Sequence, residues 1–71
     1  MPESVYKVIE VIGSSPESWE KAAANAVRKV TESVEDLRIA EVVQLDIQIE
    51  ENKIVAYRAK LNVSFRYHEE A

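Results

Sequence analysis

The sequence predicts an α+β protein with the element order β-α-β-β, in which a three-stranded antiparallel sheet of order 1-3-2 wraps around one helix. Three observations predict this class: a β-rich run near the amino end, one amphipathic helical stripe, and two long alternating segments joined by a short turn. The 71 residues suffice for one domain, which we expect to span 1–71.

The first strand is predicted over residues 5–12, where Val and Ile dominate the run VYKVIEVI. The only glycine, Gly13, follows at once and ends this run. Ser15 and Pro16 are a helix-start signal, since serine is a good N-cap and proline suits the first helical position. We therefore expect the helix to begin at Pro16.

The helix is predicted over residues 16–34. Its apolar positions recur at spacings of three and four, which places them on one side of a helix. Most of them are small, so the helix can approach a sheet closely. The sole tryptophan, Trp19, lies on this stripe, and we expect it to anchor the core or a subunit contact rather than to stack on a ligand. The stripe comprises Trp19, Ala22, Ala23, Ala26, Val27, Val30 and Val34.

Residues 37–50 and 53–67 are predicted to form a long hairpin, with Glu51-Asn52 as its turn. Strict alternation assigns the apolar members of the first hairpin strand to one face, together with a single carboxylate, Glu41. That predicted face consists of Leu37, Ile39, Glu41, Val43, Leu45, Ile47 and Ile49.

The predicted lengths do not match. About 13 residues per hairpin strand extend roughly 43 Å, whereas about 19 helical residues extend roughly 28 Å. One helix cannot cover apolar strands of that length, and a large apolar patch rarely remains in water. The sequence therefore predicts a homo-oligomer.

Composition argues against several function classes. The chain has no cysteine, one glycine and a single histidine, His68, in the tail, so we expect no enzyme. The net charge of −4 and the scattered basic residues argue against nucleic-acid binding. No apolar stretch is long enough to span a membrane, and no secretory signal is evident, so we expect a cytoplasmic location.

Two carboxylates are candidate metal ligands. Glu41 interrupts an apolar strand face, and Glu10 interrupts the first strand. A buried carboxylate needs a cation or a hydrogen-bond donor, so each of them fits either a salt bridge or a divalent-metal site such as calcium. The sequence leaves both alternatives open.

Several segments, taken in order, resemble the dodecin family over about residues 4–67. The resemblance is carried by Val5-Tyr6-Lys7-Val8-Ile9-Glu10, Gly13-Ser14-Ser15-Pro16, Trp19-Glu20, Leu37-Arg38, Glu41-Val42, and Tyr57 through Leu61, Val63 and Phe65. It implies a hollow shell of twelve subunits, a dodecamer, that binds or stores a small ligand. Better-known members stack paired flavin rings between tryptophans near a subunit interface.

Two departures bear on the ligand pocket. The flavin-stacking tryptophan is replaced by Ile39, and the glutamine that bonds the flavin edge is replaced by Arg58. Isoleucine has no π face and arginine accepts no hydrogen bond, so we expect flavin not to bind in the family's usual way. Both substitutions resemble a non-flavin branch, calcium dodecin.

The sequence thus predicts a dodecin-like shell that stores a small molecule or a cation, with calcium as the cofactor that the resemblance suggests. Binding of riboflavin or FMN through different contacts is the alternative. A third interpretation is a purely structural shell, or one that holds an anionic cofactor through Arg58.

Overall fold

The computed structural model describes residues 4–67 and contains three strands and one helix. They are β1 (Tyr6–Ser15), α1 (Trp19–Thr31), β2 (Leu37–Glu50) and β3 (Lys53–Arg66). The predicted tail around His68 and the first three residues lie outside the described part of the chain.

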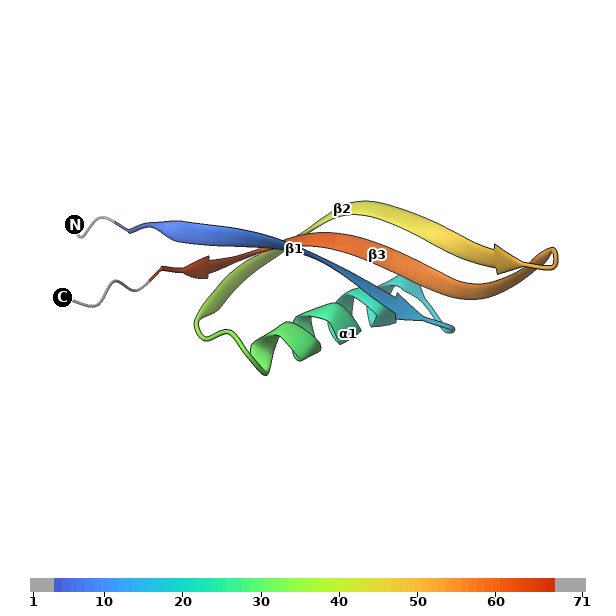
Figure 1. Ribbon diagram of the computed structural model, residues 1–71, viewed down its shortest axis with the longest axis horizontal. Helices are drawn as coiled ribbons and strands as arrows, with labels where there is room; N and C mark the ends of the chain where they lie inside the picture. The colour runs from blue at the N-terminus through green and yellow to red at the C-terminus, as the bar shows by residue number, and fades with distance from the viewer. Residues whose placement is uncertain (1–3, 68–71) are drawn as a thin grey trace.

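The three strands form one antiparallel sheet of order β1-β3-β2, which confirms the predicted topology. Figure 1 shows α1 lying against one face of this sheet, while the hairpin of β2 and β3 extends beyond the start of the helix. We call the covered side of the sheet the helix face and the other side the open face.

The start of α1 differs from the prediction. The helix begins at Trp19 with Ser18 as its N-cap, and the Ser18 hydroxyl accepts a hydrogen bond from the Lys21 backbone N–H at 3.0 Å. The predicted cap, Ser15, is instead the buried last residue of β1, and its hydroxyl accepts from the Glu17 N–H. Both Ser15 and Ser18 could cap the helix. Ser15 is excluded from this role because it pairs with Tyr57 as the last residue of β1.

The helix also ends earlier than predicted, at Thr31 instead of residue 34. The backbone N–H groups of Ser33 and Val34 both bond to the Val30 carbonyl at 3.0 Å, which closes the last turn. Asp36, with a φ of 65°, then reverses the chain into β2. Residues 32–34, which the apolar spacing assigned to the helix, therefore belong to the connection between α1 and β2.

The predicted face of β2 is wrong because the strand is irregular. Its pairing with β3 shifts between Leu37 and Ile39 and again between Val42 and Gln44, so one extra residue is inserted at each place. Side chains that strict alternation puts on one face are thereby divided between the helix face and the open face. The pairing places Leu37, Ala40, Val42, Leu45 and Ile47 on the helix face, and three of them lie opposite the buried Ala59, Leu61 and Val63 of β3.

Ile39 and Glu41 are consequently on the open face, opposite Ser64 and Asn62 of β3. Glu41 is exposed, so it is not the buried carboxylate that the alternating pattern predicted. The irregularities could not be read from the hydropathy pattern, since the residues at both shifts are compatible with either face.

The core is small and lies where α1 crosses the sheet. Ala22 and Ala26 pack against Ala59, Leu61 and Val63 of β3. Gly13 of β1 permits this approach: a Cβ at that position would overlap the Ala22 carbonyl oxygen and lie 2.8 Å from the Ala26 Cβ. The small residues of the helical stripe therefore bring α1 into direct contact with the strand backbone.

Beyond α1, the hairpin keeps its apolar side chains in solvent, as the predicted mismatch of lengths requires. The molecule measures 54 × 20 × 15 Å. Near the turn, the cross-strand partners Ile49 and Ile54 are 61% and 57% exposed. Within residues 4–67, no helix is both long and apolar enough to cross a membrane.

We expect Gly13→Ala to lower the free energy of unfolding by about 1–3 kcal/mol, because the new methyl group would force α1 away from β1. Chemical denaturation followed by circular dichroism measures this loss. Ser14→Ala, at the adjacent exposed position, is the matched control. Equal stability of the two variants would contradict the proposed close contact.

Candidate functional site

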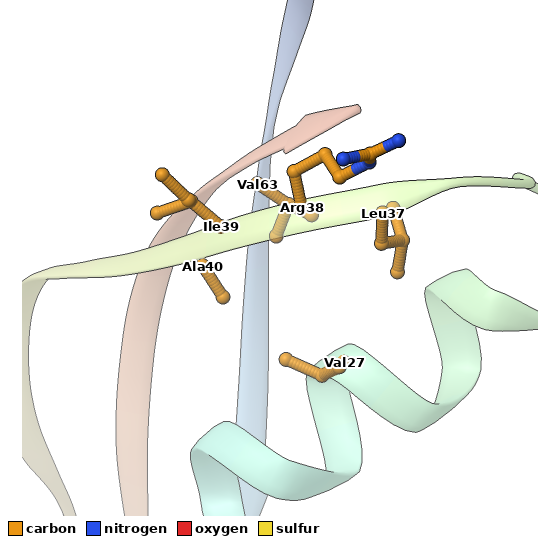
Figure 2. Close-up of a pocket in the computed structure, with 6 residues that line it drawn as sticks. All are labelled: Val27, Leu37, Arg38, Ile39, Ala40 and Val63. Carbon is orange, nitrogen blue, oxygen red and sulfur yellow. The ribbon is translucent and has the colours of Figure 1, made fainter. Parts of the chain in front are cut away.

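The clearest candidate site surrounds Ile39 near the start of β2, where two adjacent hollows share Arg38 and Ile39. One, of about 280 Å³, lies at the edge of β2 beside Val27 of α1 (Figure 2). The other, of about 540 Å³, is also lined by Tyr6 and Ser64, which places it on the open face. The predicted ligand-pocket residue Ile39 therefore does border a cavity, and its side chain is 66% exposed.

The irregularity at the start of β2 brings Arg38 and Ile39 to the same side of the strand. Leu37 pairs with Phe65 and Ile39 pairs with Ser64, so Arg38 is the extra residue between them. Figure 2 shows Leu37 and Ala40 directed toward α1, whereas Arg38 and Ile39 project from the other side of the strand. A bulge can re-aim a side chain in this way, and here it places a guanidinium beside an exposed apolar residue.

Arg38 is held by a carboxylate. Its Nε donates to Asp36 Oδ1 at 2.9 Å, and this hydrogen bond raises the pKa of Arg38 above its ordinary value. The guanidinium remains charged at any pH at which the protein is folded. The cavity around Ile39 consequently has a permanent positive group at its rim.

Arg58, the second predicted pocket residue, lies elsewhere on the open face. It pairs with Asp46, whereas Ile39 pairs with Ser64 six residues along β3. Six residues of extended strand correspond to about 20 Å. One chain therefore does not bring Ile39 and Arg58 into a single pocket.

Arg58 is also engaged by a partner. Its Nε and Nη2 donate to the two carboxylate oxygens of Asp46 at 2.7 and 2.9 Å, the two-pronged geometry in which arginine binds carboxylates best. The hydrogen bond from Arg58 lowers the pKa of Asp46 and raises that of Arg58. Within one chain, the arginine that was predicted to line the ligand pocket links β3 to β2.

Trp19 of α1 also contacts β2 at Asp46. Its indole Nε1 donates to the Asp46 carbonyl at 3.0 Å, and its ring stands edge-on to Tyr57 with the ring centroids 5.3 Å apart. Asp46 thus binds α1 through its backbone carbonyl and β3 through its side-chain carboxylate. Trp19 serves as an anchor between α1 and the sheet.

The two predicted metal ligands lie in one row across the open face. Glu10 of β1 and Glu41 of β2 both pair with Asn62 of β3, which separates them by two strand spacings, about 10 Å. All three side chains offer the oxygen donors that calcium prefers. Within residues 4–67, however, no three acidic or histidine side chains gather closely enough to hold a metal ion.

Comparison with known proteins matches residues 5–68 to the dodecin family model. The chain belongs to the dodecin family. This membership accounts for the β-α-β-β order and the 1-3-2 sheet, which solved dodecin structures share.

Individual dodecins extend the match over nearly the whole chain. The calcium dodecin of Mycobacterium tuberculosis is 51% identical over 63 residues, which are 89% of each chain. Its crystal structure, described as that of a calcium-chelating antigen with a novel calcium-binding site, superposes with a TM-score of 0.84 at 47% identity, covering 96% of this chain and 97% of that one. The dodecin of Streptomyces coelicolor gives a TM-score of 0.91 at 33% identity, covering 99% and 100%.

Family membership favours small-ligand binding over catalysis for this dodecin. Sequence reasoning missed three features of the site: Arg38 at the cavity, Tyr6 as its wall, and Asp46 as the partner of Arg58. Asp46 and Arg58 have opposite charges and lie five and six residues from the predicted turn at Glu51-Asn52, which could have suggested the last pair. No sequence signal marks the bulge that brings Ile39 to the same side as Arg38.

The lowered pKa of Asp46 predicts a pH-dependent contribution to stability. A carboxylate whose pKa is lower in the folded than in the unfolded state stabilises the folded protein at pH values above its unfolded-state pKa, which is near 4. This stabilisation is lost as the pH falls through the folded-state pKa. We expect Asp46→Asn to unfold at a lower temperature than the wild type at pH 7, with the difference decreasing as the pH falls below about 4.

Melting curves between pH 7 and pH 3 measure this difference. Glu41→Gln, which removes one exposed carboxylate of the same face, should show no comparable convergence with the wild type if the effect belongs to the Arg58 pair. A constant difference between Asp46→Asn and the wild type across this range would refute the assignment.

Proposed function

We propose that this dodecin assembles into a homo-oligomeric shell of twelve copies that binds and stores a small ligand or cation, calcium among them. The observation that carries the proposal is the 51% identity to a calcium dodecin over 89% of the chain. The assembly itself is supported by the apolar surface that one chain leaves uncovered.

The surface available for assembly is continuous along the helix face. Beside α1, a hollow of about 420 Å³ is lined by Trp19, Ala23, Val42 and Leu45, together with Glu20. The exposed pair Ile49 and Ile54 continues this apolar surface to the end of the hairpin. Apolar patches of this extent on small proteins mark contacts between chains, so neighbouring copies are the expected cover.

The row of Glu10, Asn62 and Glu41 supports the calcium part of the proposal. These oxygen donors are of the right chemical kind, and the flanking strands place both carboxylates on one face. Calcium takes six to eight oxygen ligands, which exceeds what these three side chains supply. Water and a second copy of the chain are the natural sources of the remaining ligands.

Assembly should depend on the hairpin. We expect the wild type to sediment as a particle of about 97 kDa, twelve copies of the 8.1 kDa chain, and Ile49→Lys with Ile54→Lys to shift it to smaller species. Ala24→Lys, exposed on α1 between the buried Ala22 and Ala26, is the matched control and should leave the particle intact. A stable wild-type monomer at micromolar concentration would contradict the proposal.

Calcium binding should be measurable by calorimetry on protein treated with a chelator and then freed of it. We expect Glu41→Gln to weaken binding roughly tenfold or more, because a ligating carboxylate is lost. Glu35→Gln, an exposed carboxylate in the connection between α1 and β2, controls for the loss of one surface charge. Absence of heat at millimolar calcium in the wild type would exclude the calcium function.

A further inference from the structure

We propose that the cavity formed by Tyr6, Arg38, Ile39 and Ser64 binds a small aromatic acid, with Arg38 as the group that receives the ligand's carboxylate. The inference rests on the proposed small-ligand function and names the ligand class for this cavity. It assigns to Arg38 the anion-binding role that one of the alternative interpretations of the sequence gives to Arg58.

The cavity has the size and walls of a small-molecule site. Its volume of about 540 Å³ falls within the range of about 300–1,000 Å³ that is usual for ligand pockets. The side chains of Tyr6 and Ile39 are 49% and 66% exposed, so one aromatic and one aliphatic wall are available to a flat apolar body. Both lie on strands of the same sheet, which keeps these walls fixed relative to each other.

Ser64 occupies the middle strand, between the two apolar sides. Its Oγ is 3.4 Å from the Ile39 carbonyl, to which it donates a hydrogen bond. The hydroxyl oxygen can still accept a bond from a ligand. The middle strand therefore offers one hydroxyl to a ligand, whereas Tyr6 and Ile39 offer apolar surface on either side of it.

Two arginines, Arg38 and Arg66, lie with one carboxylate, Asp36, at one end of the cavity. Arg38 bonds Asp36 through Nε, whereas Arg58 uses both Nε and a terminal nitrogen for Asp46. A guanidinium has five N–H donors in a planar fork that matches a carboxylate, so Arg38 can bind a ligand carboxylate while keeping the Asp36 contact. Arg66, directly opposite Tyr6 on the same face, adds a second cation at this end.

Two carboxylates without a neighbouring arginine in their row lie at the other end. Glu10 and Glu41 flank Asn62, two residues along β3 from Ser64, or about 7 Å. This arrangement orients an acid, because its carboxylate is attracted to the Arg38 end and its ring occupies the apolar middle. It also disfavours a second negative charge at the far end of the ligand.

The test compares naphthoate with its neutral amide, naphthamide, by calorimetry on the assembled wild-type protein. The two probes share one aromatic body and differ in charge. We expect naphthoate to bind at least about tenfold more tightly, as a charge-assisted hydrogen bond should provide. Equal affinities, or no binding of either probe at millimolar concentration, would overturn the inference.

Three variants locate the effect. Arg38→Met should abolish the preference for naphthoate, whereas Arg58→Met, which removes a guanidinium of the same face about 20 Å away, should preserve it. Ile39→Asp changes an exposed side chain, so this variant still provides a test if Arg38→Met does not fold. It should weaken the binding of naphthoate more than that of naphthamide. Equal losses in Arg38→Met and Arg58→Met would show that the preference reflects general charge and would overturn the assignment.

Sedimentation and calcium titration of the same samples separate this inference from the function on which it rests. A protein that assembles and binds calcium but does not distinguish the probes refutes the aromatic-acid site alone. A protein that prefers naphthoate through Arg38 but remains monomeric and binds no calcium refutes the shell and calcium proposal, while the cavity assignment stands.

Discussion

A helix of 13 residues has to cover a sheet whose two longest strands have 14 residues each, and this mismatch governs the molecule. The helix is about 20 Å long and the strands about 47 Å. Contact between α1 and the sheet is consequently concentrated in one small cluster, where Gly13 and the alanines of α1 allow the closest approach. The rest of the hairpin has apolar side chains that no part of the same chain covers.

The attachment of α1 to β2 compensates for the small size of this cluster. Trp19 bonds the Asp46 backbone, and the Asp46 carboxylate binds Arg58 of the next strand. A short chain of directional contacts thus joins the helix start to the two strands of the hairpin. These polar contacts do not depend on a large buried area, which this chain lacks.

Irregular pairing on β2 determines which groups share a face. The extra residue at Arg38 moves Ile39 to the open face beside this cation, and the shift after Val42 returns Leu45 to the helix face. Without these shifts, Ile39 would be directed toward α1. The cavity on the open face exists because the strand departs from regular alternation.

The alternating segments and the turn at Glu51-Asn52 were sufficient to predict the hairpin, and the helical stripe was sufficient to predict one helix on one face. The ends of α1 were not predictable, because Ser15 and Ser18 are equally good caps and strand pairing decides between them. The site was predictable only in part. Ile39 does border a cavity, but whether Arg58 faces a ligand or Asp46 depends on strand register, which hydropathy does not specify.

The two-residue turn at the end of the hairpin restricts how such a chain can change in evolution. Glu51 and Asn52 both have positive φ, the conformation that a tight hairpin turn requires, so the turn itself has no slack for an added residue. Beyond the last irregularity, a single insertion in one strand would exchange its two faces and direct Ile49 away from its present neighbours. Gain or loss of length in this hairpin is therefore compatible with the same assembly surface only when both strands change together, by an even number of residues each.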